Sequence, residues 1–336
     1  MFGPHVNRYH ATGKRPSMAA HIEAACREAA ADGDFRVGAV AFFVSDTRAL
    51  EINLHPDERA PLRALIKRTG LRAIAHSSYK AFPWNGNPAG AAFLREELKV
   101  CQEAGVEGLV VHLPKEPIST VLKYLHRLVE PTVEGVRVYF ETPAVVPSET
   151  YYETPKKLAA LFKAIRERDP ELARFGLCVD TSHLWVSGND MQSYEAADTW
   201  FRELEDFKEI IPHDRIMLHL NDSRTPRGHG PDEHAGFGLG KIWQEYCLLG
   251  FEKSGLAAVV DYARRHNMPA ILERKPKEAL KLDYRILHSL APECRISQKR
   301  GGTLVLQDED VHALEREFMG TPVAEADEDH SCGCGE

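Results

Sequence analysis

The chain carries His, Asp and Glu residues directly after short apolar runs, where such side chains could bind metal ions. The runs LRAIA, GLVV, VRVYF, FGLCV, RIML and PAIL each precede one of them. A continuous apolar run is typical of a parallel strand that is buried on both faces. With three further residues of the same types, the candidates are His76, His112, Glu141, Asp180, His183, His219, Asp232, His234 and Glu273. Nine nitrogen and oxygen ligands exceed what one ion binds, so the sequence predicts a multinuclear metal site.

Helical segments separate the predicted strands, and residues 56–70 and 88–105 are two of them. Alternation of strands and helices predicts parallel βαβ units, and eight units fit if the first strand lies near residues 2–6. We therefore expect an α/β fold, a (β/α)8 TIM barrel over residues 1–291, with the metal site at the C-terminal mouth of the strands. Residues 292–336 are expected to form a C-terminal extension that ends in an acidic, disordered tail with Cys and His residues.

The composition is that of an ordinary globular protein, with 336 residues, 43% hydrophobic and 27% charged. It has no long apolar segment and no signal-like N-terminus, which predicts an intracellular protein of the cytoplasm or nucleus, neither secreted nor membrane-bound. The net charge of −8 at first argues against nucleic acid as a partner. Bound divalent cations would offset the candidate carboxylates, so net charge discriminates weakly. The seven cysteines, an odd count at irregular spacing, are expected to be buried thiols in a reducing compartment.

Each motif also has a structural interpretation. Asp180 could cap the next helix while His183 packs against it. Asp232 and His234 share one face of an extended segment, but they could equally belong to a solvated loop over residues 221–240. Taken singly, most of these positions are more often structural than catalytic. Their occurrence together, at the ends of successive strands, favours the metal site.

The ordered set of motifs resembles the endonuclease IV family of apurinic/apyrimidinic endonucleases, within the xylose isomerase-like barrels. The resemblance rests on CVDTSH, on LHLNDS, and on DEH beginning thirteen residues after His219, with AHSSY, VVHLP, YFETP and ILE completing it. It spans roughly residues 1–290.

The resemblance implies a DNA repair endonuclease that holds three Zn2+ per chain, with Mn2+ able to substitute. In the family pattern the first ion is held by His76 and His112, and Glu141 bridges it to the second ion. The second ion is completed by Asp180, His219 and Glu273. The third ion is held by His183, Asp232 and His234. Glu141 would be the catalytic residue, and a metal-bridging hydroxide would attack the phosphorus. The implied substrate is double-stranded DNA with an abasic site, cut on its 5′ side to leave a 3′-hydroxyl. The enzyme is expected to act as a monomer without a protein partner.

The predicted DNA contacts are Arg48, Tyr79, Arg224 and Arg227. The segments SDTRALEI, HLPK and TPAVVPSET depart from the family pattern, and no tryptophan follows Arg48. The alternative function is a sugar isomerase or epimerase on the same barrel, which would use one or two ions and need no third site. The tail residues His330, Cys332 and Cys334 are too few for a closed zinc site.

Overall fold

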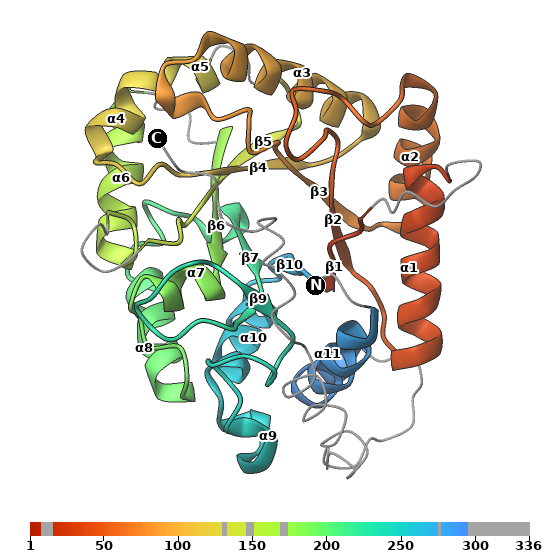
Figure 1. Ribbon diagram of the computed structural model, residues 1–336, viewed down its shortest axis with the longest axis vertical. Coiled ribbons are helices and arrows are strands. Elements are labelled where there is room, and N and C mark those ends of the chain that lie inside the picture. The colour runs from red at the N-terminus through yellow and green to blue at the C-terminus, as the bar shows by residue number, and fades with distance from the viewer. Residues whose placement is uncertain (8–15, 130–132, 146–150, 169–173, 275–276, 295–336) are drawn as a thin grey trace.

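A computed structural model describes residues 1–7, 16–129, 133–145, 151–168, 174–274 and 277–294. Eight parallel strands form its barrel, in the spatial order β1, β10, β7, β6, β5, β4, β3, β2 (Figure 1). Their bounds are β1 Phe2–Pro4, β2 Ala39–Phe43, β3 Arg72–His76, β4 Gly108–His112, β5 Arg137–Glu141, β6 Phe175–Asp180, β7 Ile216–His219 and β10 Ala270–Leu272. A parallel bridge between His5 and Ala41 joins the two outermost strands. The predicted (β/α)8 barrel, with its first strand near residues 2–6, is confirmed.

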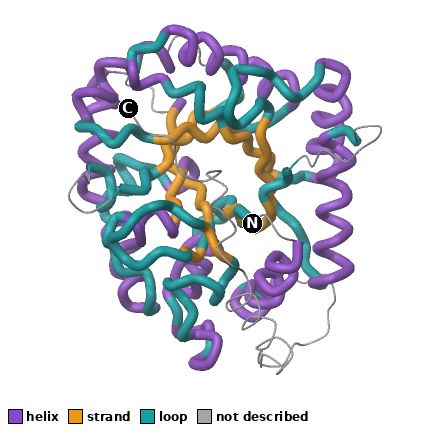
Figure 2. Tube along the Cα trace, viewed as in Figure 1, coloured by secondary structure: helices purple, strands orange, loops and turns teal. Residues whose placement is uncertain are grey.

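Helices surround the strands on the outside, as Figure 2 shows. They are α1 Met18–Gly33, α2 Pro56–Thr69, α3 Pro88–Ala104, α4 Ile118–Tyr124, α5 His126–Val129, α6 Pro155–Arg168, α8 Tyr194–Glu205, α10 Gly255–Arg265 and α11 Lys277–Leu290. The two predicted helices end where expected, because Gly70 and Gly105 adopt the left-handed backbone conformation of a C-cap at φ 69° and 73°.

Shorter elements lie between the barrel strands and the outer helices in the described part of the chain. Helices α7 Thr181–Val186 and α9 Tyr246–Leu249 lie in the second half. The 3-10 turns are η1 Pro83–Asn85, η4 His213–Arg215, η5 Phe251–Lys253 and η6 Pro292–Cys294. Within the predicted loop 221–240, β8 Asp222–Ser223 and β9 His234–Ala235 form a small antiparallel ribbon. The loop is therefore an ordered, hydrogen-bonded structure.

The barrel interior is a small core, separate from the larger one between strands and helices. It consists of Ala39, Ala41, Ile74, Val110, Tyr139, Cys178, Met217 and Ile271. Added Cβ atoms on Gly108 and Gly176 would lie 2.3 Å and 2.6 Å from the Tyr139 ring, so only glycine leaves room for that ring. Side chains alternate along a strand, so the residue two positions after an interior residue also faces inward. This alternation determines which side chains at the strand ends face the barrel mouth.

The cysteine prediction is correct in part. Cys101 and Cys178 are buried, whereas Cys26 and Cys247 are half-buried because they pack against the margin of the core; all four are free thiols. The first residues of the predicted extension pack on the barrel, where the backbone N–H of Arg36 donates to the Cys294 carbonyl at 2.6 Å. Residues 295–336, with the acidic tail and its His and Cys residues, lie outside the described part. Among the described helices, none has the length and apolar character needed to cross a bilayer.

Candidate metal centre

Six of the candidate ligands stand at one level of the barrel because each follows an interior core residue by two positions. For example, Ile74 is an interior residue and His76 follows it by two positions on β3. The same spacing occurs in the pairs Val110 and His112, Tyr139 and Glu141, Cys178 and Asp180, Met217 and His219, and Ile271 and Glu273. Register pairs His112 with Glu141 and Asp180 with His219 on neighbouring strands. The strands therefore deliver all six side chains to the C-terminal mouth, as the sequence predicts.

The first group consists of His76, His112 and Glu141, whose ligand atoms lie within 4.8 Å of one another. One carboxylate oxygen of Glu141, Oε2, is 2.8 Å from Nε2 of His112 and 3.2 Å from Nε2 of His76. The Nδ1–H of His76 donates to the Ser77 carbonyl at 2.8 Å. That bond fixes the tautomer and leaves the Nε2 lone pair of His76 facing the group, as a metal ligand requires.

The second group shares Glu141 and adds Asp180, His219 and Glu273. The other oxygen of Glu141, Oε1, is 2.7 Å from Nδ1 of His219. The same nitrogen is 3.3 Å from Glu273 Oε2 and 3.8 Å from Asp180 Oδ2. Glu141 is 1% exposed and offers one oxygen to each group. It is therefore placed to bridge two ions.

The third group is built by α7 and the ribbon, outside the barrel strands. Asp232 Oδ2 lies 3.2 Å from Nε2 of His183 and 2.9 Å from Nε2 of His234. Its other oxygen accepts from the Ser182 hydroxyl at 2.6 Å. Asp180 joins this group too, 3.7 Å from the His234 nitrogen. All nine candidates thus converge on one mouth.

Asp180 caps α7 and also faces the other candidate ligands. Its Oδ1 accepts from the backbone N–H of His183 at 3.0 Å, while its Oδ2 faces the second and third groups. The Nδ1–H of His183 donates to the Thr142 carbonyl at 2.6 Å, which leaves Nε2 for an ion. The capping interpretation and the ligand interpretation of this motif are therefore compatible.

The donor set fits divalent cations. Four carboxylates are gathered in the mouth with five imidazoles, and Glu141, Asp180 and Asp232 are buried. Burial raises the pKa of the Asp180 carboxyl, and nearby His183 and His234 do not fully offset this. For Glu141, burial would also raise the pKa, but His112 and His219 outweigh it and hold the pKa well below its usual range. Imidazole and carboxylate together suit zinc, and such charges are rarely buried without a partner.

Three residues that the sequence did not predict, Asn221, Arg274 and His5, support the carboxylates of the second group. The Asn221 amide N–H donates to Asp180 at 2.6 Å and to Glu273 at 3.1 Å, and its oxygen accepts from Arg274 at 2.7 Å. His5, the residue directly after β1, lies 3.2 Å from Glu273. These contacts orient the carboxylates of the second group. The Asn following LHL was visible in the sequence, but an amide is not a typical ligand.

Asp222 anchors the segment that carries the third group. Its carboxylate accepts from the backbone N–H groups of Ser223, Gly238, Gly240 and Ile242 at 2.8–3.2 Å. Burial raises the pKa of this carboxyl to about 6 in spite of those four bonds. One buried side chain therefore fixes the fold of the ribbon and its following turn.

Glu97 is a second buried carboxylate, and it holds the turn that follows the first group's ligand His76. It reaches from α3 and accepts from the hydroxyls of Ser45 and Ser77 at 2.5 Å and from the backbone N–H of Ser78 at 2.8 Å. It is fully buried, and burial raises its pKa to about 7. The turn that it holds directly follows His76. No sequence pattern indicates this role, since Glu97 occurs in an amphipathic helix beside another glutamate.

Aromatic rings line the mouth beside the first group. The Tyr79 ring centroid lies 5.4 Å from that of His112 and 5.6 Å from that of His76. Phe43, at the end of β2, lies 5.0 Å from His76 and 5.9 Å from Tyr79. Tyr79 is half-buried. The predicted contact residue therefore lies at the candidate site, with an apolar partner that was not predicted.

The three predicted arginines are surface residues. Arg48 is exposed on the turn after β2, and the neighbouring Thr47 carbonyl accepts from the backbone N–H of Tyr79 at 3.1 Å. Arg224 is exposed beside the ribbon. Arg227 donates to the Gly188 carbonyl at 2.8 Å and pairs with Asp190 at 3.1 Å. Arg48 is thus adjacent to the aromatic rim, and the Arg227 side chain contacts Gly188 and Asp190.

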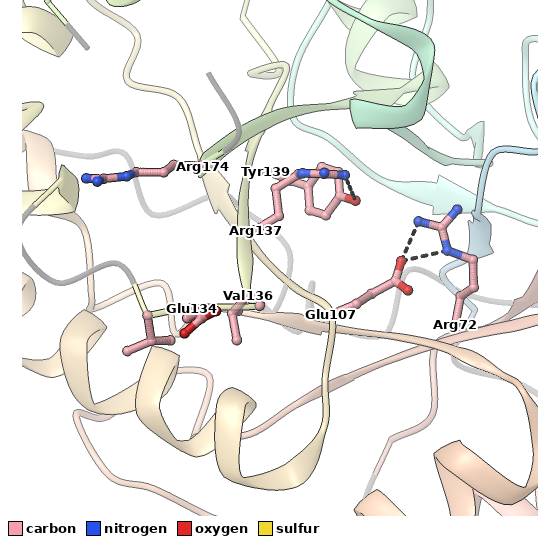
Figure 3. Close-up of a pocket in the computed structure, with 9 residues that line it drawn as sticks. Arg72, Glu107, Glu134, Val136, Arg137, Tyr139 and Arg174 are labelled. Atoms are coloured by element: carbon pink, nitrogen blue, oxygen red, sulfur yellow. Dashed lines mark hydrogen bonds and ion pairs between the residues drawn. The ribbon is translucent and has the colours of Figure 1, made fainter. Parts of the chain in front are cut away.

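A cavity of about 570 Å³ lies at the opposite end of the barrel (Figure 3). An ion pair between Arg72 and Glu107, 2.7 Å from Nε to the carboxylate, forms one side, and Arg137 and Tyr139 contribute to the lining. Arg72 and Arg137 start β3 and β5, and Glu107 directly precedes β4, whereas candidate ligands end those strands. The cavity is therefore separate from the metal centre.

Comparisons with known proteins agree with this architecture. The sequence pattern of the xylose isomerase-like TIM barrel family, AP endonuclease family 2, matches residues 26–281. A probable AP endonuclease of African swine fever virus is 38% identical over 241 residues, which are 71% of this chain and 80% of the relative. The chain therefore belongs to the AP endonuclease 2 family of xylose isomerase-like TIM barrels, which confirms the resemblance seen in the sequence.

Two solved structures share the fold along most of their length. The crystal structure of AsfvAP:AG superposes with a TM-score of 0.80 at 34% identity, covering 86% of this chain and 98% of that one. Endonuclease IV from Thermus thermophilus superposes with a TM-score of 0.66 at 25% identity, covering 87% and 99%. The (β/α)8 barrel of this chain thus corresponds to nearly the whole of each.

Proposed function

We propose that this protein is a zinc-dependent DNA repair endonuclease that hydrolyses the phosphodiester 5′ to an abasic site and leaves a 3′-hydroxyl. As a member of its family it is a hydrolase of the apurinic/apyrimidinic endonuclease type. The observation that carries the proposal is the convergence of nine nitrogen and oxygen ligands into three groups linked by Glu141 and Asp180.

The three groups fit three ions, one each. When bound, divalent cations supply Lewis-acid charge to phosphate oxygens and lower the pKa of water, as phosphodiester hydrolysis requires. Glu141 would hold ions of the first and second groups together, because it gives one oxygen to each of these groups. His5 and Asn221 hold the Glu273 carboxylate in place. Zn2+ suits this donor set, and Mn2+ can use the same ligands.

The rim beside the first group suits a nucleotide without a base. Tyr79 and Phe43 offer apolar ring surface next to the ligands His76 and His112. A nucleotide without a base leaves the duplex at lower cost than an intact one, because its stacking and pairing are already lost. Arg48, exposed on the adjoining turn, is placed to contact a backbone phosphate of double-stranded DNA.

The third group argues against the alternative of a sugar isomerase or epimerase. Such an enzyme needs only one or two ions and would not require Asp232 beside His183 and His234. These residues lie 2.9–3.2 Å apart and are fixed by Ser182 and by the ribbon. A dedicated third site is the feature that separates the two functions.

The test is cleavage of a labelled duplex that contains one abasic-site analogue. An undamaged duplex and a chelator-treated sample serve as controls. A single chelator-sensitive nick on the 5′ side of the lesion is expected. Absence of a nick from zinc-loaded protein, with turnover of a ketose substrate instead, would establish the alternative.

A further inference from the structure

A second cluster of metal-ligand residues lies outside the barrel, away from the mouth. Glu205 ends α8, His213 begins η4 just before β7, and His266 caps the end of α10. One ligand atom from each residue lies within 4.8 Å of the other two. His219, the mouth ligand on β7, is at the other end of that strand, so this cluster shares no residue with the three groups described above.

His213 and His266 are half-buried residues, and the Nε2 atom of each is buried without a hydrogen-bond partner. Their ring centroids are 3.7 Å apart, and Nε2 of His266 lies 3.8 Å from Oε1 of Glu205. The hydroxyl of Tyr262, whose ring is 4.7 Å from His266, is also buried and unpartnered. Buried polar atoms almost always have a partner, so three orphaned atoms in one place indicate a missing one.

The residue types of the cluster suit a divalent cation as that partner: Glu205 supplies a negative charge, and the positive side chains of Arg265 and Lys208 lie nearby. Burial lowers the pKa of both His213 and His266, which keeps the imidazoles neutral and their lone pairs available. Arg265 lies 3.6 Å from Oε2 of Glu205, so the arginine engages one carboxylate oxygen while Oε1 faces the imidazoles. Two neutral imidazoles and one carboxylate form a three-residue zinc ligand set, with water as the fourth ligand.

We propose that Glu205, His213 and His266 bind a further zinc-type divalent cation that ties α8, α10 and the start of β7 together. Tetrahedral ligands at zinc distances lie about 3.3 Å apart, so the 3.8 Å separation of His266 and Glu205 needs only a small contraction. Because the three residues come from separate segments, the ion would stabilise the packing of the outer helices on the barrel and take no part in the reaction at the mouth.

The test compares zinc content and thermal stability in single variants of the full chain. Glu205→Gln removes the half-exposed carboxylate with little risk to folding, and His266→Gln removes an imidazole. Glu203→Gln, at an exposed position of the same helix, is the matched control. Each protein is equilibrated with buffered free zinc and assayed for bound zinc per chain, melting temperature and nicking of the abasic duplex.

The wild type and Glu203→Gln are expected to hold one zinc more per chain than the two ligand variants. Added zinc should raise Tm by about 5 °C more in the wild type, and nicking should be unchanged. Equal zinc content and equal Tm shifts in all proteins would overturn the proposal and indicate a histidine pair bridged by water. If the barrel mouth binds no zinc, the wild type should still hold one zinc more than Glu205→Gln and His266→Gln. The proposed function and the proposed outer zinc site can therefore fail independently.

Discussion

Replacing Asp232 with asparagine should remove the third ion and leave the first two groups loaded. The carboxylate stands between Nε2 of His183 and Nε2 of His234, and its other oxygen accepts from Ser182. An asparagine of the same shape can keep the bond to Ser182. It then presents an N–H2 group, which cannot bind a cation, to the two imidazoles.

The size of the effect follows from the number of ligands. Structural zinc sites bind with roughly 10–16 kcal/mol over four ligands, or about 3–4 kcal/mol for each. Loss of Asp232 should therefore weaken the third site by about 10²–10³-fold, since 1.4 kcal/mol corresponds to a factor of ten. At nanomolar free zinc we expect a similar loss of nicking, which millimolar zinc partly restores.

The assay measures nicking of the abasic duplex across a range of buffered zinc concentrations, together with bound zinc per chain. Asp57→Asn, at an exposed position in the first turn of α2, is the control for the change in charge. If Asp232→Asn retains the zinc content of the wild type and nicks at the wild-type rate at every zinc concentration, the third group is not a metal site.

Four further predictions concern other parts of the site. Glu141→Gln should reduce nicking at least about 10³-fold, because both of its oxygens face ligand groups, while circular dichroism stays unchanged. Chelation should lower Tm by about 10 °C or more, seen by calorimetry, since bound ions stabilise the folded state. The pKa of Glu97 is raised to about 7, so the folded state binds the proton more tightly. Its contribution to the free energy of unfolding should therefore fall by about 3 kcal/mol as pH rises from 4.5 to 7. Urea unfolding of the metal-free proteins should show this fall in the wild type and not in Glu97→Gln. Arg48→Ala should weaken DNA binding in a titration and reduce the salt slope by about 0.9, and an unchanged slope would assign the phosphate contact elsewhere.

The sequence predicts the barrel and the placing of the candidate ligands at the strand ends, because both depend on local patterns. An apolar run followed by His, Asp or Glu can be seen without knowledge of the fold, and strand alternation then brings these residues to one level. His5 escaped notice because β1 has only three residues and ends in proline. Its role depends on the position of β1 between β10 and β2, which no local pattern specifies.

The remaining features depend on contacts between distant segments. Glu97 has the sequence context of a surface residue, and its burial results from the turns after β2 and β3 folding over α3. Asn221 acts through hydrogen bonds to two carboxylates from other strands. His213 and His266 meet only because α10 packs beside the start of β7. No local pattern distinguishes such residues from ordinary polar positions.

The distribution of ligands over many strands also sets an order of assembly during synthesis. The first group is complete in the chain once Glu141 has been made, but the second group lacks a ligand until Glu273 emerges. The ribbon that carries His234 joins the third group to the second through Asp180. A nascent chain that has not yet reached Glu273 therefore cannot assemble the linked set of candidate ligands, and any ion shared by these groups would bind only after that residue has been made.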